Sequence, residues 1–90
     1  MEFTHRENQI ALYSDSSELL AEITFPYIDS ETVNIDHTFV DVSLRGQGIA
    51  GKLMVELVRE LESRKLKAVP TCSYAVEWFS RHQEYSGLLK

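Results

Sequence analysis

The segment Arg45-Gly46-Gln47-Gly48-Ile49-Ala50 joins an extended, β-branched stretch that ends near Val42 to a long amphipathic stretch. Three of the four glycines in the chain, Gly46, Gly48 and Gly51, fall within six residues here. Glycine tolerates positive φ and lets a ligand come close to the backbone. A helix that begins directly behind it offers unpaired N–H groups and a positive dipole end. The segment therefore predicts either a plain tight turn or an anion site, with a phosphate of a cofactor as the anion.

The residues before this turn alternate in the way that β-strands do. Four strands are expected, separated by polar turns, and Pro26 favours an edge position or a bulge at the end of the third. Their predicted ranges are Met1–Arg6, Gln9–Ser14, Leu19–Tyr27 and Thr32–Val42. In the fourth, one face is expected to carry Val33, Ile35, His37 and Phe39.

After the turn, the spacing of apolar residues becomes that of an amphipathic helix. A helix is expected from Gly48 to about Arg64, because apolar residues recur there at three- and four-residue spacing. A fifth strand (Leu66–Pro70), a second helix (Tyr74–His82) and a final turn (Glu84–Lys90) follow. The predicted fold class is α+β, with two main helices and a five-stranded, mostly antiparallel sheet. Because a helix joins the fourth and fifth strands, these two are expected to be parallel neighbours.

Composition limits what the chain can be. Its 90 residues, 43% of them hydrophobic and 26% charged, predict a single globular domain over residues 1–90. A net charge of −5 argues against a nucleic-acid partner. The polar start and the absence of a long apolar run predict no signal peptide and no membrane partner. A single cysteine, Cys72, cannot form an internal disulfide, which favours a reduced, cytoplasmic protein. No His, Cys and carboxylate spacing indicates a metal.

Cys72 is expected on the same edge of the sheet as the glycine turn, because both follow the carboxyl ends of parallel strands. Ligands of such sheets tend to bind at that edge. Arg45 and Lys52 flank the turn and are candidates to contact a phosphate. A magnesium-dependent P-loop is disfavoured, because Gly51-Lys52-Leu53 lacks the Ser or Thr that would hold the metal.

Arg45-x-x-Gly48-x-Ala50 matches the Q/R-x-x-G-x-G/A signature of the GNAT acetyltransferases, and other motifs extend the likeness over essentially all of the chain. Small single-domain GNAT-like proteins carry an H-T-x-V strand, then R-G-x-G-x-A, P-x-C-S-[YF] and H-x-x-Y. Here these segments begin at His37, Arg45, Pro70 and His82, in the same order. The chain resembles this family, which implies a minimal GNAT-like fold with a parallel strand–helix–strand unit.

The resemblance implies acetyl-CoA as co-substrate. Amides around Arg45, Gly46, Gln47, Gly48, Ile49 and Ala50 would then hold the pyrophosphate. Phe39, Val40 and Val42 would lie along the pantetheine like an added strand, with the acetyl group directed towards Cys72. Lys52 and Ser73 complete the expected cofactor contacts, although Ser73 is also expected to cap the second helix.

Three residues are candidates for catalysis. Cys72 at a helix start is favoured as a thiolate, so it either accepts acetyl, lines the acetyl pocket while an amine attacks directly, or only fills the strand-to-helix corner. His37 is either a base, acting through water, or a cofactor contact, or a partly buried core histidine. Tyr74 either protonates the departing CoA thiolate, as in larger members, or is a packed aromatic.

The sequence also departs from larger members of the family, since it has no room for the segments that build their acceptor pocket. An open site suits a protein or peptide amine, and an acidic surface suits a basic acceptor. The expected function is an acetyl-CoA-dependent N-acetyltransferase with an amine acceptor that the sequence does not identify. The alternative is a non-catalytic acyl-CoA-binding or interaction module, and nothing in the sequence specifies an oligomeric state.

Overall fold

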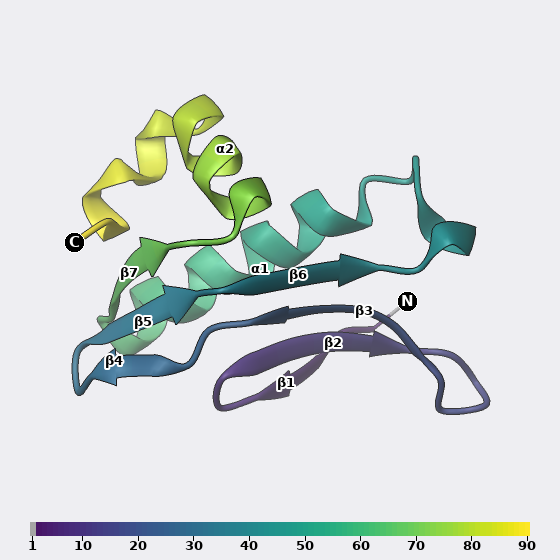
Figure 1. The fold of residues 1–90 in the computed structure, drawn as a ribbon. Coiled ribbons are helices and arrows are strands. Elements are labelled where there is room, and N and C mark those ends of the chain that lie inside the picture. The colour runs from purple at the N-terminus through teal and green to yellow at the C-terminus, as the bar shows by residue number, and fades with distance from the viewer. Residues whose placement is uncertain (1) are drawn as a thin grey trace.

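The structure, a computed structural model, describes residues 2–90, and Met1, where the first strand was expected to begin, lies outside them. Residues 2–90 form seven strands, two α-helices and two short 3-10 helices, which are arranged as Figure 1 shows. The strands are β1 (Thr4–Arg6), β2 (Gln9–Tyr13), β3 (Leu19–Thr24), β4 (Tyr27–Asp29), β5 (Thr32–Ile35), β6 (His37–Val40) and β7 (Lys67–Pro70). The helices are η1 (Val42–Leu44), α1 (Ile49–Arg64), α2 (Ser73–Arg81) and η2 (Gln83–Leu88).

The strands form two sheets, so the prediction of one five-stranded sheet is wrong. The first is antiparallel in the order β1-β2-β3-β6, and the second has the order β4-β5-β7. In the second sheet β5 and β7 are parallel, with Thr32 opposite Lys67 and Ile35 opposite Pro70. Helix α1 lies between β5 and β7 in the sequence and forms the connection between these two parallel strands. The expected parallel unit is therefore present, although it involves only the first part of the predicted fourth strand.

Two predicted strands are each interrupted, the third near its end, where Pro26 was expected to cause a bulge or an edge position. The third becomes β3 and β4, separated at Phe25 and Pro26, and the fourth becomes β5 and β6, separated at Asp36. Thr24 pairs with His37, whereas Tyr27 pairs with Val33. Between these two pairs the chain advances three residues from Thr24 to Tyr27 but four residues from Val33 to His37, so the β5–β6 side has one extra residue. Such a bulge reverses which side chains face the core.

The core lies between the strands and α1, which runs behind the sheet in Figure 1 and packs on β2, β3 and β6. The predicted helical stripe is confirmed, since five of its members are fully buried: Leu53, Met54, Leu57, Val58 and Leu61. Helix α2 buries Ala75, Trp78 and Phe79 as expected. Both helix ranges agree with prediction to within one residue at each end. Within residues 2–90 no helix has the length and apolar character needed to cross a membrane.

The two sheets diverge just where the candidate site was expected. The amides of Thr71 and Cys72 both donate to the carbonyl of Ile35, after which the chain leaves β7 and enters α2. Strand β6 continues along β3 with no strand on its other edge. The C-terminal residues cover the outer side of β7, where Leu89 bridges to Ala68. An unpaired edge of β6 therefore faces the start of α2.

Candidate functional site

The glycine turn presents free backbone donors at the start of α1. Gly46 and Gly48 have φ values of 85° and 74°, which few other residues adopt without strain. Gly48 is the N-cap of α1, and no side chain caps the helix. Within residues 2–90, the N–H groups of Gly48, Ile49 and Ala50 donate to no acceptor of the protein. Together with the helix dipole, these donors suit a phosphate.

Asp41 orders the approach to this turn, and the sequence analysis missed it. Its Oδ2 accepts from the Ser43 amide at 3.0 Å and from the Ser43 hydroxyl at 2.6 Å. These hydrogen bonds, led by the hydroxyl, hold the pKa of Asp41 below its usual value, and the positive charge of Arg45 adds to them. The Asp-x-Ser spacing is typical of such side-chain capped turns and could have identified the residue.

A cavity of about 250 Å³ lies at the turn and brings together half of the predicted site. Its predicted members are Val40, Arg45, Gly46, Gly48, Ile49, Ala50 and Tyr74. Leu44 and Gly51 also line it and were not predicted. The turn, the end of β6 and the first turn of α2 thus enclose one small volume.

Several predicted cofactor contacts lie elsewhere. Val42 falls in η1 rather than on a strand and is 73% exposed, because β6 ends at Val40. Phe39 is half-buried on the face of the sheet opposite Thr38, and Gln47 is exposed. None of these three residues lines the cavity at the turn. Their assignment as cofactor contacts remains a prediction, except that Val42 does not extend the strand as expected.

Cys72 is the N-cap of α2, so the expectation that Ser73 caps this helix is wrong. The Cys72 Sγ accepts a hydrogen bond from the Ala75 amide at 3.4 Å. It also lies 3.3 Å from the hydroxyl oxygen of Thr38 on β6. Ser73 is exposed in the first turn of the helix. Thr38 is a site residue that the sequence analysis missed, because the bulge at Asp36 had not been located.

His37 does not reach Cys72. Its side chain is 53% exposed, and its Nε2 lies 3.3 Å from a carboxylate oxygen of Glu22 on β3. Neighbouring residues of a strand point to opposite faces, and Thr38 takes the face that meets Cys72. The expected partial burial of His37 among core residues is therefore wrong, and the structure brings no Cys–His pair together.

Tyr74 stands where the cavity at the turn meets a second, larger one. A Cβ placed on Gly51 would lie 3.9 Å from the Tyr74 hydroxyl, so the ring approaches α1 closely. Burial raises the pKa of the phenol; Arg81 opposes this, while the negative charges of Cys72 and Glu77 add to it. Tyr74 therefore keeps its proton at neutral pH and is able to donate it.

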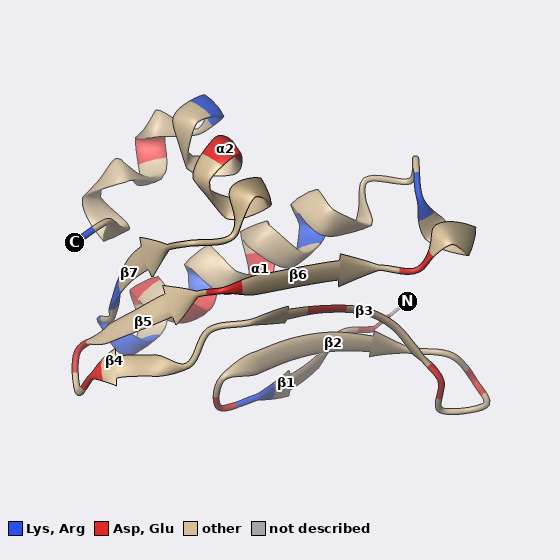
Figure 2. Cartoon of the chain, viewed as in Figure 1, with Lys and Arg blue, Asp and Glu red and all other residues tan. Residues whose placement is uncertain are grey.

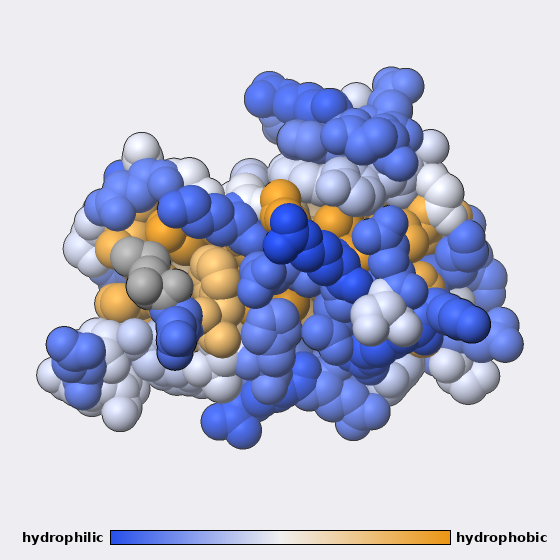
Figure 3. Space-filling model, turned by 180° about the vertical axis from the view of Figure 1, so that it is seen from behind, coloured by the Kyte–Doolittle hydropathy of each residue, from blue (hydrophilic) through white to orange (hydrophobic). Residues whose placement is uncertain are grey.

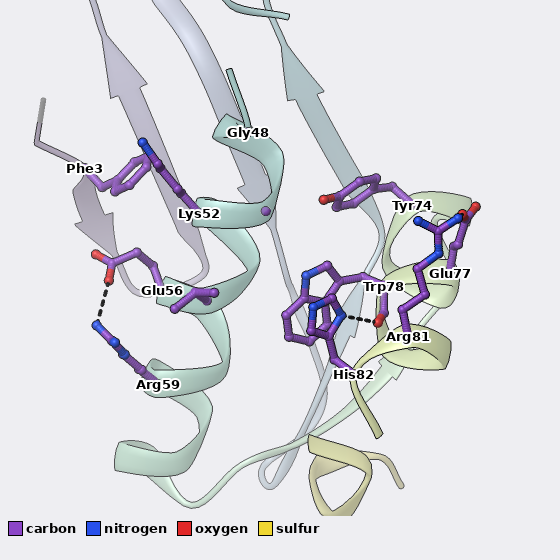
Figure 4. A pocket seen from close by; sticks show the side chains of 12 residues that line it. Phe3, Gly48, Lys52, Glu56, Arg59, Tyr74, Glu77, Trp78, Arg81 and His82 are labelled. Carbon is purple, nitrogen blue, oxygen red and sulfur yellow. Dashed lines mark hydrogen bonds and ion pairs between the residues drawn. The ribbon is translucent and has the colours of Figure 1, made fainter. Parts of the chain in front are cut away.

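The larger cavity is a groove of about 780 Å³ between α1 and α2. Figure 4 shows Tyr74, Trp78 and His82 on the α2 side, directed towards α1, whereas Lys52, Glu56 and Arg59 extend from α1 on the side away from α2, with Lys52 beside Phe3. From behind, the molecule is hollowed beneath the lobe that α2 forms, with pale and orange surface in the recess (Figure 3). Gly48, Gly51 and Tyr74 line both cavities, so the groove is continuous with the turn.

Within residues 2–90, no group of three or more His, Cys, Asp or Glu side chains is placed to hold a metal ion. The polar groups that the site offers are backbone N–H groups, the thiol of Cys72, hydroxyls and side-chain cations. These groups suit an anionic ligand and acyl chemistry.

Comparison with known proteins supports the same interpretation. A family profile described as GCN5-related N-acetyl-transferase matches residues 9–88. A GCN5-like candidate N-acetyltransferase from Staphylococcus aureus, solved by NMR, is 32% identical, with a TM-score of 0.82 over 99% of this chain and 87% of that one. A comparison with curated proteins gave no match.

Larger acetyltransferases share the fold at lower identity. Tetrahymena GCN5 is 10% identical, with a TM-score of 0.66 over 81% of this chain and 48% of that one. A GNAT acetyltransferase from Elizabethkingia anophelis, solved with acetyl-CoA bound, is 20% identical, with a TM-score of 0.62 over 86% and 51%. The chain thus spans about half the length of these two structures. On the profile match and the likeness to the Staphylococcus protein, the chain belongs to the GCN5-related N-acetyltransferase family.

Proposed function

We propose that the protein transfers acetyl from acetyl-CoA to an amine. The observation that carries the proposal is the row of uncapped N–H groups at Gly48, Ile49 and Ala50, which lies beside the unpaired edge of β6. The fold of the Elizabethkingia protein, which was solved with acetyl-CoA, supports the choice of donor.

In this proposal the pyrophosphate of CoA binds at the glycine turn. Arg45, exposed beside the turn, adds a positive charge to the backbone donors. The pantetheine arm runs from there along the free edge of β6, whose amides are available to its own amides. This path leads past Val40 and ends near Thr38 and Cys72, where the hydroxyl oxygen of Thr38 lies 3.3 Å from the sulfur of Cys72.

Two donors around the sulfur favour a relay through Cys72. The Ala75 amide and the Thr38 hydroxyl both lie within hydrogen-bonding reach of Sγ and would stabilise a thiolate. The thiolate attacks the thioester carbon, the bond to the CoA sulfur breaks, and Tyr74 donates its proton to the departing CoA thiolate. The acceptor amine then attacks the acetyl-cysteine, its proton passes to the Tyr74 phenolate, and the carbon–sulfur bond breaks to release the Cys72 thiolate.

We expect the acceptor to be a cationic molecule with a primary amine, such as a lysine-bearing peptide or a polyamine. The net charge of −5 attracts such molecules. Carboxylates lie on the hairpin turns, on β3 and at the β5–β6 junction, whereas α1 and α2 each carry both acidic and basic residues (Figure 2).

The test is an acetyl-transfer assay with two readouts. The protein is incubated with acetyl-CoA and a panel of lysine peptides and polyamines, and the release of CoA thiol is followed together with the mass of the protein. We expect amine-dependent thiol release and, without amine, an acetyl adduct on the protein that is missing from Cys72→Ala. Gly87→Ala is the matched control, because a Cβ there meets nothing within 4 Å.

Each outcome distinguishes one part of the proposal. Amine-dependent turnover that survives Cys72→Ala would retain the transferase and reject the relay in favour of direct attack. Saturable binding of acetyl-CoA without turnover on any amine would favour a non-catalytic acyl-CoA-binding module. Absence of both binding and turnover would reject the proposed function.

A further inference from the structure

The antiparallel sheet β1-β2-β3-β6 has one face that α1 does not cover. Helix α1 packs on β2, β3 and β6 and lies behind these strands in Figure 1. Helix α2 packs instead on β7 and on α1. In the part of the chain that the structure describes, residues 2–90, the face turned towards the viewer in Figure 1 therefore carries no helix. We call it the open face.

The pairing register identifies the side chains of the open face. Ile23 on β3 is fully buried in the core, so its neighbours Glu22 and Thr24 point to the opposite face. The residues that pair with these two on β2 and β6 share that face. The open face is therefore formed by Gln9, Ala11, Glu22, Thr24, His37 and Phe39.

The open face carries negative charge with little positive charge beside it. Glu22 accepts a hydrogen bond from the Gln9 side chain at 2.7 Å and lies 3.3 Å from Nε2 of His37. Asp36, exposed at the bulge, accepts from the Thr24 hydroxyl through Oδ1 at 2.6 Å, and its Oδ2 accepts no hydrogen bond within residues 2–90. Strands β2, β3 and β6 contain neither lysine nor arginine, and only β1, at the edge, contains an arginine. This charge suits a cationic partner.

Phe39 adds an aromatic ring to the open face. It is half-buried but does not pack on the hydrophobic core. It lies directly opposite Glu22 on the neighbouring strand, which sets a ring beside a carboxylate. Among cationic side chains, arginine suits this pair best, because its planar guanidinium both stacks on aromatic rings and binds carboxylates.

The open face also reaches the candidate site. The carbonyl of Ile35 accepts from the amide of Cys72, and the hydroxyl of Thr38 lies 3.3 Å from the Cys72 sulfur. Asp36 and His37 lie between Ile35 and Thr38 in the chain. A polypeptide on the open face would therefore have one of its residues beside the sulfur and the next residues over Asp36, Glu22 and Phe39.

We propose that the open face binds the acceptor as a polypeptide in which arginine flanks the acetylated lysine, with Asp36 contacting one cation and Glu22 and Phe39 contacting a guanidinium. This inference rests on the proposed function for the transfer itself. Its consequence is a specificity: the protein prefers a lysine beside arginine to an isolated lysine, and prefers such a peptide to a free polyamine.

The test compares two peptides that differ in charge alone. Each has a blocked N-terminus and a single lysine, which lies between two arginines in one peptide and between two citrullines, the uncharged analogue of arginine, in the other. We expect KM at low salt to be about fivefold lower for the arginine peptide, the upper range for an exposed ion pair. The difference should fade at high salt.

Two variants locate the contacts. We expect Asp36→Asn to raise KM for the arginine peptide about threefold and to leave KM for the citrulline peptide unchanged. Phe39→Thr, which keeps a β-branched residue on the strand, should raise KM for the arginine peptide by a similar factor and leave the affinity for acetyl-CoA unchanged. Glu62→Gln, exposed on α1, is the matched control for a lost charge and should behave like the wild type. Circular dichroism checks the fold of each variant.

The outcomes separate this inference from the proposed function. Turnover of both peptides with equal KM at low salt, or a preference for spermidine over the arginine peptide, would overturn the inference and leave the transferase standing. An equal loss on both peptides in Asp36→Asn would also overturn it, because the carboxylate would then not act on the flanking cation. Saturable NMR shifts of residues 22–24 and 36–39 with the arginine peptide, without turnover on any amine, would instead reject the proposed function and retain the peptide surface.

Discussion

The sulfur of Cys72 lies between the amide of Ala75 at 3.4 Å and the hydroxyl of Thr38 at 3.3 Å. Replacing Thr38 by valine keeps the shape of the side chain and removes the hydroxyl. Since a donated hydrogen bond favours the thiolate, we expect Thr38→Val to alkylate more slowly with iodoacetamide at fixed pH and to transfer acetyl several-fold more slowly. Thr4→Val, on exposed β1, serves as the control. Unchanged alkylation and transfer would show that this hydroxyl does not act on the sulfur.

Tyr74 supplies a second prediction at the level of one residue. Because burial raises its pKa above the ordinary 10.0, the phenol stays protonated through neutral pH and is able to act as an acid. We expect Tyr74→Phe to lower kcat by roughly 10²-fold, the lower end of general acid catalysis, with little change in KM for acetyl-CoA. The wild-type rate should decline on the alkaline side only above pH 10.0. A kcat unaffected by the substitution would remove Tyr74 from the mechanism.

His37 shows where interpretation of single residues from sequence reached its limit. A strictly alternating strand would have placed it with Val33 and Ile35, which are fully buried. The bulge at Asp36 shifts the alternation by one residue, so Thr38 faces the site and His37 faces Glu22. Pro26 indicated a bulge in the neighbouring strand, but the pairing register that transfers its effect to His37 depends on contacts between strands, which local sequence does not specify.

At the scale of elements, the turn from Asp41 to Arg45 makes the stability of the folded state depend on pH through the Asp41 carboxylate. The hydrogen bonds from Ser43 lower the pKa of Asp41, so the ionised carboxylate is favoured in the folded state. The stability that this adds is present above the ordinary pKa of 3.8 and is lost as the pH falls through the lower folded value. We expect Asp41→Asn, which lacks this charge, to reduce the protection of the Leu44 and Arg45 amides from hydrogen exchange at neutral pH, because these amides donate to the carbonyls of Asp41 and Val42 within the same turn. At a pH below the lowered pKa of Asp41 the wild type and the variant should converge, and a difference that persists there would contradict this origin.

The start of α1 offers a sharper test of the anion site. A Cβ at Gly48 meets nothing within 4 Å, and Asn and Asp tolerate positive φ better than other residues with side chains. We expect both Gly48→Asn and Gly48→Asp to fold, but only the aspartate to place a negative charge among the free N–H groups. Acetyl-CoA should therefore bind at least about tenfold more weakly to Gly48→Asp than to Gly48→Asn. Equal affinities, measured by calorimetry, would place the diphosphate away from this turn.

The helices were predictable and the sheets were not, for a physical reason. The helical spacing of apolar residues in α1 can be recognised from its local sequence alone. Lys65, with a φ of 57°, adopts the left-handed conformation that ends this helix. The division into two sheets instead depends on where β7 leaves β5, which the amides of Thr71 and Cys72 fix by sharing the carbonyl of Ile35. Likewise, the groove between α1 and α2 needs the packing angle of two helices, which no motif in either one encodes.

At the scale of the whole molecule, the proposed binding site for the donor is formed by separate parts of the chain that the fold brings together. In the proposed function, the turn before α1 would hold the diphosphate, and the free edge of β6 would guide the pantetheine towards Thr38 and Cys72. The two larger acetyltransferases share the fold with this chain over about half of their own length.

The most direct test of this account is an NMR titration of the protein with acetyl-CoA, following every backbone amide. We expect saturable shifts concentrated in three segments, residues 38–40, 44–52 and 72–82, with the amides of Gly48, Ile49 and Ala50 among the largest. Amides of the β1–β2 hairpin, remote from the turn, should remain unchanged. Absence of saturable shifts, or shifts confined to that hairpin and β4, would contradict the proposal that this protein holds acetyl-CoA at the glycine turn.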